Sequence, residues 1–457
     1  MKHGEHYEQT YAPVAGWVTI RLLLALVLIF NWHTVQLDYV LAFPQAPVER
    51  ELYMKLPSGF TVTGVENPSE YVLRINRNIY GQKQAGRVWF QYLKKRLIVE
   101  LGFRQSKIDE CVFFKDDMIY VICTDDSILA GPNKQEINKT IEMMKRIKLN
   151  VTVEGELTDF LGVNIDRKTD GTIYLTQSKL IDQIIKDLRL GDNNVVTKTT
   201  PAAPRKLLSR HQTSPAFDNS FNYRSVIGKL NYVERGSRPD IAYALHQCAR
   251  FSVDPKVEHA KAVRRIVRYL KGTKDYGMIL RPDTSKSLEV HVDADFAGAW
   301  DKSLAGIDKD TARSRHGYVI SYAGIPICWK SQLQQEIALS STESDITGLS
   351  YALREAIPIV ELLHEIRTYG FDVETRRTKI HCKVFEDNSG AVEIANFPKA
   401  RPRTKHINNR LFHFYDYVER GDVSIHHIAS DDQPADFLTK PLPEANFVRH
   451  RRAIMGW

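Results

Sequence analysis

Nine consecutive apolar residues, Leu22 to Phe30 (LLLALVLIF), place the strongest constraint on the fold. A helical membrane span needs about twenty such residues, so this run is too short to cross a bilayer. Arg21 stands at its edge and no small-residue cleavage site follows, which argues against a secretory signal. We therefore expect Val18 to Phe30 to form a buried helix, with a signal or membrane anchor as the less favoured alternative.

The composition is that of a folded protein, and its modest basic excess favours a polyanionic partner without proving one. Hydrophobic residues make up 43% of the chain and charged residues 26%, which excludes disorder throughout. The 63 Lys and Arg residues exceed the 55 Asp and Glu residues, so the formal net charge is +8. The five cysteines form no CxxC pair, which argues against a zinc site and indicates a reducing, intracellular setting. The sequence does not distinguish between a location in a cytoplasmic particle and one in the nucleus.

The pattern of elements divides the 457 residues into three parts, as the length allows. Residues 1–200 mix strands and helices, and residues 201–284 are mainly helical. Residues 285–457 begin with antiparallel strands and continue with alternating strands and helices, which is typical of an α/β domain. The helix Lys256 to Lys271 carries basic residues beside an apolar face. Among these, Arg264 and Arg268 are candidates for phosphate contacts, with a solvated face as the alternative.

A first acidic site is expected at a hairpin. Asp125 and Asp126 stand between the apolar strands Met118 to Cys123 and Ile128 to Ala130. Adjacent carboxylates repel each other unless a cation or solvent neutralises them, although Asp-rich turns are common at surfaces. Asp38 ends another apolar stretch. A strand-end Asp combined with a hairpin Asp pair is an arrangement that can hold two Mg²⁺ ions.

A second acidic site is expected in the last part. Each of its four residues stands where a strand ends or a helix begins, at spacings of 50, 44 and 49 residues: Asp293, Glu343, Asp387 and Asp436. Such positions can converge on one sheet edge and hold two Mg²⁺ ions across a scissile phosphate. We interpret the neighbouring Asp295 and Asp345 as supporting or solvent-exposed, and Glu386 as structural.

Longer motifs run along the whole chain in one order. They are YEQTYAPVA (Tyr7 to Ala15), TIRLLLAL (Thr19 to Leu26), VQLD with AF (Val35 to Phe43), ELYMKLPSGF (Glu51 to Phe60), IYGQKQAGRVW (Ile79 to Trp89), DFLGV (Asp159 to Val163), YRSVIGKLNY (Tyr223 to Tyr232) and RPDIAYAL (Arg238 to Leu245). The last part adds VDADFAG, ALSSTE, EDNSGA, RTKHINNR and ADFLTKPL. With these motifs the chain resembles the reverse transcriptase and ribonuclease H segment of Ty1/copia-type LTR retrotransposon polyproteins.

The resemblance implies an α/β (α+β) architecture of three domains. Residues 1–200 are expected to form a right-hand polymerase palm with partial fingers, and residues 201–284 a thumb- or connection-like region. Residues 285–457 are expected to form a ribonuclease H-like mixed sheet with flanking helices. The implied activities are templated DNA synthesis and metal-dependent cleavage of RNA in RNA–DNA hybrids. The implied partners are an RNA template, a DNA primer, the hybrid and deoxynucleoside triphosphates, with two Mg²⁺ ions per site (Mn²⁺ as a substitute) and no membrane.

The resemblance also implies roles for individual residues. The catalytic metal ligands are Asp38, Asp125 and Asp126 in the polymerase and Asp293, Glu343, Asp387 and Asp436 in the ribonuclease H. The remaining candidates are Phe43 under the nucleotide sugar, Lys83 and Gln84 beside template and nucleotide, Phe160, Leu161 and Gly162 at the primer end, and Arg403, Lys405 and His406 at the hybrid backbone. Core packing is the alternative for Phe43 and Phe160, and a solvated loop for the basic run.

Some positions depart from the family pattern. Cys123-Thr124 stands where Tyr-Val usually precedes the two Asp residues, and the basic fingers strands that usually precede YEQT are missing. We therefore expect an N-terminally truncated enzyme with a weakened polymerase and an intact ribonuclease H. The alternative is a catalytically defective relic that retains nucleic-acid binding alone.

Overall fold

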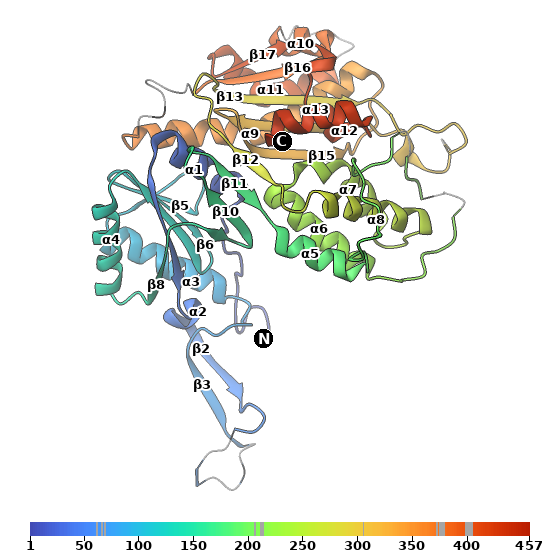
Figure 1. The fold of residues 1–457 in the computed structure, drawn as a ribbon. Coiled ribbons are helices and arrows are strands. Elements are labelled where there is room, and N and C mark those ends of the chain that lie inside the picture. Colours follow the sequence, from blue (N-terminus) through green and yellow to red (C-terminus); the bar gives the residue numbers. More distant parts are fainter. Residues whose placement is uncertain are drawn as a thin grey trace. The chain divides into compact units, whose positions relative to one another are not determined.

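The computed structural model of the chain describes residues 1–60, 63–64, 67, 70–204, 207–210, 214–304, 306–371, 373, 380–397 and 405–457. It forms two compact units (Figure 1). Unit 1 consists of Met1–Gly16, Phe30–Leu157 and Tyr369–Phe371, and unit 2 of Trp17–Ile29, Thr158–Thr368 and Asp372–Trp457. The three-domain division drawn from the sequence stays a prediction.

Unit 1 is built on an antiparallel sheet of six strands in the order β4-β5-β6-β7-β1-β8. The strands are β1 (His33–Tyr39), β4 (Arg104–Gln105), β5 (Val112–Lys115), β6 (Met118–Cys123), β7 (Asp126–Gly131) and β8 (Val151–Gly155). All six residues of β6 are buried, as the predicted apolar strand requires. The long-range pairing of β1 with β7 brings residues about 90 positions apart into register, and this pairing positions the first acidic site.

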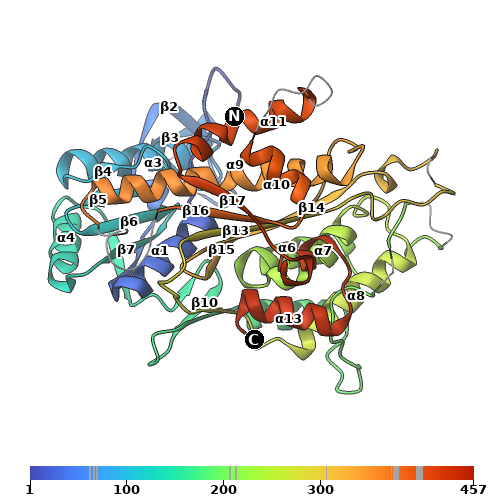
Figure 2. The same ribbon diagram turned by 90° about the horizontal axis from the view of Figure 1, so that it is seen from above.

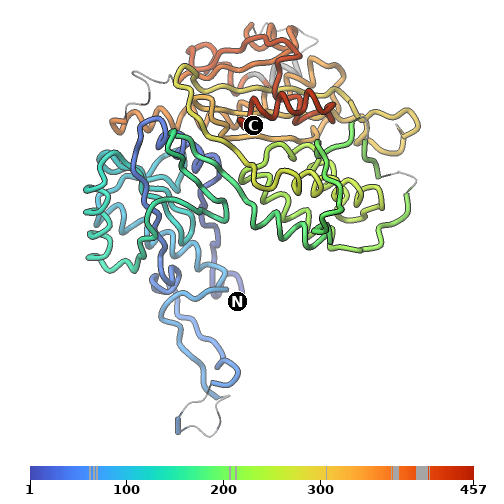
Figure 3. The backbone as a smooth tube through the Cα atoms, viewed as in Figure 1, coloured from blue at the N-terminus to red at the C-terminus, as the bar shows by residue number. Residues whose placement is uncertain are grey.

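Helices and one hairpin complete unit 1. The helices are α2 (Ala42–Gln45), α3 (Ala85–Lys95) followed by the π-helical turn Arg96–Glu100, and α4 (Lys134–Arg146). Asn133 caps α4, because its side chain accepts hydrogen bonds from the first free backbone N–H groups. The hairpin of β2 (Pro47–Lys55) and β3 (Val72–Arg77) extends away from the six-stranded sheet (Figure 3).

The apolar run forms α1 (Trp17–Phe30), and every residue from Ile20 to Ile29 is buried. This confirms the predicted buried helix. Arg21 lies on the same buried surface, where its guanidinium donates to the carbonyls of Ile327 and Arg235 at 2.8 and 2.7 Å. Burial lowers the pKa of Arg21 to about 10. Among the described residues, no helix combines the length and apolarity that a membrane crossing requires.

The first part of unit 2 contains a small antiparallel sheet and a group of helices. The sheet has the order β12-β11-β10-β9, with β9 (Asp159–Phe160), β10 (Val163–Arg167), β11 (Ile173–Thr176) and β12 (Met278–Leu280). The helices are α5 (Ser178–Asp187), α6 (Tyr223–Ser237), the 3₁₀ turn Pro239–Ile241, α7 (Ala242–Ala249) and α8 (Val257–Gly272). The predicted apolar face of α8 is confirmed, since Val263, Ile266, Val267 and Leu270 are fully buried.

The last part of unit 2 is a mixed five-stranded sheet in the order β15-β14-β13-β16-β17. Its strands are β13 (Leu288–Asp295), β14 (Arg315–Tyr322), β15 (Ile325–Leu333), β16 (Cys382–Glu386) and β17 (Val423–His427). The first three pair antiparallel, while β13-β16 and β16-β17 pair parallel. This arrangement agrees with the expected ribonuclease H-like mixed sheet.

Helices flank this sheet on both sides (Figure 2). They are α9 (Ser341–Thr368), α10 (Ser389–Asn396), α11 (Lys405–Glu419), α12 (Asp436–Thr439) and α13 (Glu444–Met455), with 3₁₀ turns at Lys309–Thr311 and Ser430–Asp432. The long helix α9 packs on β13 and β14, because Gly348 brings its backbone close to Val292 and Ala294. Parallel strands end at the same edge, so β13 and β16 present their C-terminal residues together.

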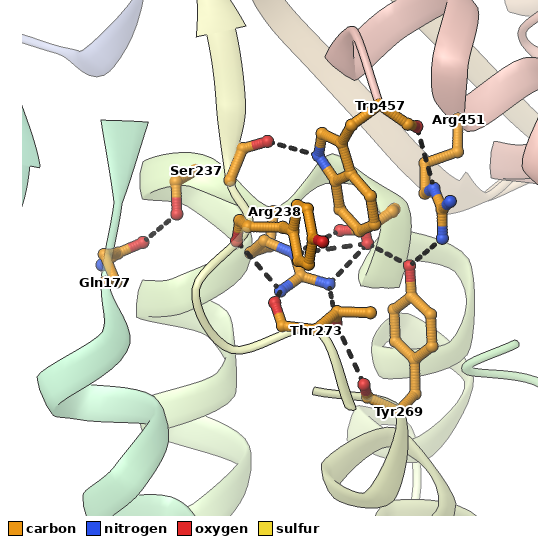
Figure 4. Close-up of polar contacts among 10 residues, drawn as sticks. Gln177, Ser237, Arg238, Tyr269, Thr273, Arg451 and Trp457 are labelled. Carbon is orange, nitrogen blue, oxygen red and sulfur yellow. Dashed lines mark hydrogen bonds and ion pairs between the residues drawn. The ribbon is translucent and has the colours of Figure 1, made fainter. Parts of the chain in front are cut away.

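A buried ion pair ties the helices of unit 2 to its C-terminus (Figure 4). Arg238 and Asp240 have fully buried side chains and meet at 2.7 Å. Arg238 also donates to the Thr273 carbonyl at 2.9 Å. The indole of Trp457 lies 3.8 Å from the Arg451 guanidinium and donates to the Gly277 carbonyl at 2.5 Å. This network satisfies charges that burial otherwise makes costly.

Candidate active sites

The first acidic site lies at the junction of β1 with the β6–β7 turn. The antiparallel register of β1 and β7 places Asp38 directly opposite Asp126. Directly opposed residues project from the same face of a sheet with Cβ atoms about 5 Å apart. Asp125 occupies the adjoining turn, and its carbonyl accepts a 2.9 Å hydrogen bond from the Tyr39 amide. The structure therefore brings the three predicted polymerase acids to one place, each of them half-buried.

The turn that carries the acid pair has a constrained backbone. Thr124 adopts a φ of 62°, a left-handed conformation that β-branched residues rarely take and that costs about 1–3 kcal/mol. The indole N–H of the buried Trp89 donates to the Thr124 carbonyl at 2.8 Å and holds the turn in this conformation. The preceding Cys123 is buried, and this burial raises its thiol pKa to about 11. Cys123 thus supports the turn as a small apolar residue.

An aromatic pair borders this site. Phe43 is half-buried in α2, and its ring lies 4.7 Å from that of Tyr80. Partial burial raises the pKa of Tyr80, and the negative charges of Asp125 and Asp38 add to the effect. Tyr80 therefore lies near enough to both acids for their charges to affect it. The sequence analysis did not single out Tyr80, although the residue lies in the IYGQKQAGRVW motif.

The other predicted polymerase contacts have varied surroundings. Lys83 is exposed, whereas Gln84 is buried at the start of α3 with its side-chain oxygen unpartnered. Phe160 is fully buried, which agrees with the core-packing alternative for its ring. Leu161 and Gly162 form the tight β9–β10 turn with φ values of 50° and 68°. Their role at a primer end stays a prediction.

The second acidic site lies at the C-terminal edge of the five-stranded sheet. Asp293 near the end of β13 is buried, and Asp387 directly follows β16. Asp436 is the first residue of α12. The pKa of Asp293 is raised to about 6, mainly by burial, while the charges of Asp436 and Asp387 contribute and Lys440 opposes the rise. Three of the four predicted acids therefore influence one another.

The fourth convergent acid is Asp345, which corrects the expectation of Glu343. Asp345 is buried and accepts a 2.8 Å hydrogen bond from the Asn388 amide. Burial raises its pKa to about 7, and the charges of Asp293 and Asp387 contribute. Glu343 instead accepts a 2.8 Å hydrogen bond from the Leu339 amide at the start of α9. Two residues separated by two positions lie about 200° apart on a helix, so only one of them can face the sheet.

A further buried carboxyl group lies behind these acids. Glu386 is fully buried, and its Oε1 atom accepts hydrogen bonds from the amides of Asp387 and Asn388 at 3.0 and 3.1 Å. Its Oε2 atom has no hydrogen-bond partner. Burial raises the pKa of Glu386 well above its usual value, and the charge of Asp345 adds to the shift. The sequence analysis interpreted Glu386 as structural and did not predict its charge interaction with Asp345.

The donor set of the second site suits a hard divalent cation. Its candidate donors are carboxylate oxygens, which Mg²⁺ and Mn²⁺ prefer, and one carboxylate oxygen of the neighbouring Glu386 has no hydrogen-bond partner. In the described parts of the chain, no group of three acidic, His or Cys side chains is already arranged around a cation position. The ammonium of Lys440 contacts two of the acids, at 2.8 Å from Asp436 and 3.3 Å from Asp293.

The basic residues predicted to contact the nucleic-acid backbone have different surroundings. Arg264 donates to the Leu188 carbonyl at 3.1 Å and to the Ser220 hydroxyl at 3.3 Å, so its guanidinium serves internal structure. Arg264 also lines the same cavity as Arg268, and its phosphate contact stays a prediction. Arg268 lines a cavity of about 330 Å³ together with Lys198 and Lys261. Arg403 lies outside the described residues, as do the side chains of Lys405 and His406.

The chain is similar in sequence to known proteins. The family model described as "Reverse transcriptase (RNA-dependent DNA polymerase)" matches residues 1–204. The putative transposon Ty5-1 protein of Saccharomyces cerevisiae is 30% identical over 332 residues, which cover 70% of this chain and all of that protein. The chain belongs to the Ty1/copia-type retrotransposon reverse transcriptases.

Longer members of the family extend beyond the matched region. The retrovirus-related Pol polyprotein from transposon RE1 of Arabidopsis thaliana is 32% identical over 450 residues, or 97% of this chain. The corresponding polyprotein from transposon RE2 is 30% identical over 457 residues. This Ty1/copia-type chain spans 29% of the length of each of these two polyproteins.

Proposed function

We propose that this chain is a metal-dependent nuclease for the RNA strand of RNA–DNA hybrids, with Asp293, Asp345, Asp387 and Asp436 as its metal ligands. The observation that carries the proposal is the convergence of these carboxylates from β13, α9, the end of β16 and α12 around the buried Asp293. Burying several carboxylates together is costly without a compensating cation. Such a cost is typical of a site built for function.

The chain's own residues prepare this site. Asn388 orients the Asp345 carboxylate, and the Thr439 hydroxyl donates to Asp293. Both contacts fix the positions of acids that come from different elements. Two bound Mg²⁺ ions would activate a water molecule for attack on the scissile phosphate and stabilise the charge of the leaving 3′-oxygen. Substrate recognition through the sugar–phosphate backbone is expected to be independent of base sequence.

We also propose templated DNA synthesis at the first acidic site, with Asp38, Asp125 and Asp126 as metal ligands. The supporting observation is the register that sets Asp38 opposite Asp126 beside the constrained Thr124 turn. The substrates are an RNA or DNA template, a DNA primer and deoxynucleoside triphosphates. Phe43 and Tyr80 are positioned to contact the nucleotide sugar, and the exposed Lys83 is available to template or triphosphate.

The test is Mg²⁺-dependent cleavage of a labelled RNA–DNA hybrid, with primer extension measured on the same preparation. Asp345→Asn and Glu343→Gln form a matched pair on one helix. We expect Asp345→Asn to lower cleavage by roughly 100-fold or more, as loss of a metal ligand does, and Glu343→Gln to change it little. Equal losses in both variants would contradict the assignment of Asp345.

Asp125→Asn separates the two proposed activities. We expect it to abolish primer extension and to leave hybrid cleavage unchanged. Extension that survives this substitution would overturn the assignment of the first site. A folded chain with neither activity would instead be a relic that retains nucleic-acid binding alone.

A further inference from the structure

Lys440 lies inside the second acidic site. It directly follows α12, one helical turn after Asp436, so the two side chains project toward each other. Its ammonium lies 2.8 Å from Asp436 Oδ1 and 3.3 Å from Asp293 Oδ2. One cation on a flexible stem therefore bridges two carboxylates that belong to different elements.

The segment that carries Lys440 is firmly anchored. Phe437, Leu438 and Thr439 are buried, and the Leu438 carbonyl accepts a hydrogen bond from the Ser331 hydroxyl. The Lys440 side chain itself is 35% exposed, whereas that of Asp293 is 3% exposed. The ammonium can therefore leave toward solvent while the backbone and the acids stay in place.

We propose that Lys440 is a tethered counter-cation that competes with a divalent metal ion for the position between Asp293 and Asp436. This inference rests on the proposed nuclease function. Two cations cannot share that position, because like charges a few ångströms apart repel strongly in a partly buried site. Lys440 thus stabilises the acids before metal binds and weakens their affinity for metal. The remaining acids, Asp345 and Asp387, have no ion pair with Lys440 in the described structure.

The competition has a measurable consequence in the absence of nucleic acid. Lys440→Gln removes the cation but keeps a polar side chain of similar length. We expect the full-length variant to bind Mn²⁺ at least about tenfold more tightly than the original chain in calorimetric titrations at fixed ionic strength. Without metal, its melting temperature should fall, and the increase produced by saturating Mn²⁺ should be larger.

Lys383→Gln is the matched control. This substitution removes the same formal charge from the same sheet. Lys383 is exposed on β16 and lies on the face of the sheet opposite to that of Glu386. We expect its Mn²⁺ affinity to stay within twofold of the original. Lys440→Met also removes the cation and should likewise bind Mn²⁺ more tightly, which keeps the test valid if Lys440→Gln folds poorly. Lys440→Arg retains a cation and should bind Mn²⁺ as weakly as the original chain.

Four outcomes are distinguishable. Tighter binding in Lys440→Gln alone, lost again on adding Asp293→Asn, supports the inference. Unchanged affinity in Lys440→Gln, with binding that still requires Asp293, overturns the inference and leaves the proposed metal site standing. If no variant binds Mn²⁺, both the inference and the proposed metal site are overturned. If Mn²⁺ binding depends on Asp293 but the chain does not cleave the hybrid, the proposed nuclease function is overturned. In that case the competition between Lys440 and metal is still supported, provided that Lys440→Gln binds Mn²⁺ more tightly.

Discussion

Replacing Arg238 by Met tests how strongly unit 2 depends on its buried ion pair. Arg238 donates to Asp240 at 2.9, 3.2 and 2.7 Å and to the Thr273 carbonyl and hydroxyl at 2.9 and 2.8 Å (Figure 4). Both side chains of the pair are fully buried. Met fills much of the Arg volume but leaves the Asp240 carboxylate with the Tyr269 hydroxyl as its remaining side-chain donor among the described contacts.

The expected cost follows from this geometry. Breaking a buried ion pair by removing one partner typically costs about 3–5 kcal/mol, because the other charge remains buried and uncompensated. We therefore expect Arg238→Met to lower the free energy of unfolding of unit 2 by about that amount. Removing both charges in Arg238→Met with Asp240→Asn should cost less than the sum of the two single substitutions by about 2 kcal/mol or more.

The assay is urea denaturation at pH 7, followed by circular dichroism, for the original chain, both single variants and the double variant. A loss below about 1 kcal/mol in Arg238→Met, or strict additivity in the double variant, would refute the reasoning. Lys229→Met is a suitable control, because its 2.7 Å ion pair with Asp187 is partly exposed. Such pairs contribute about 0–1 kcal/mol.

Three further outcomes are expected. Burial raises the pKa of Glu234 from 4.5 to about 7, so the folded state binds its proton more tightly than the unfolded chain. Stability should therefore fall by about 1–3 kcal/mol between pH 4.5 and 7 relative to Glu234→Gln, and parallel stability–pH curves would contradict this. Leu24→Ala should cost about 2–5 kcal/mol in thermal or urea unfolding, since Leu24 is buried in α1, and a cost below 1 kcal/mol would place this helix outside the core. Trp89→Phe removes the donor to the Thr124 carbonyl and should lower primer extension more than hybrid cleavage, whereas equal losses would indicate a general folding defect.

Local patterns in the sequence were sufficient for much of the fold. The apolar run predicted α1, the continuous apolar stretch MIYVIC predicted β6 and the alternating stretch LEVHV predicted the start of β13, because burial of apolar surface dominates the local choice of structure. Asp38, Asp125 and Asp126 were also accessible from sequence, since each stands where an apolar strand ends. The point where a strand ends depends on the turn-forming residues and on the length of the apolar run, and both can be read from a few neighbouring residues.

Positions within a helix were harder to predict. Glu343 and Asp345 both precede the apolar part of α9, and the sequence contains no local signal that tells which one faces the sheet. The contact between α9 and β13 makes that choice, and it selects Asp345. The same holds for Arg264, because its basic character suggested a phosphate contact and only the packing shows that it also hydrogen-bonds to Leu188 and Ser220.

The sequence by itself determined the family, the class of chemistry and the places where the acids leave their strands, because these depend on residue type and short-range order. The tertiary structure decided which side chains meet. Asp345 lies near Asp293, Tyr80 lies near Asp125, and Lys440 bridges Asp293 and Asp436. Except for Lys440 with Asp436, which are one helical turn apart, these pairs are 45 to 147 residues apart in the sequence. Burial and charge act over a few ångströms in space, and only the folded chain sets those distances.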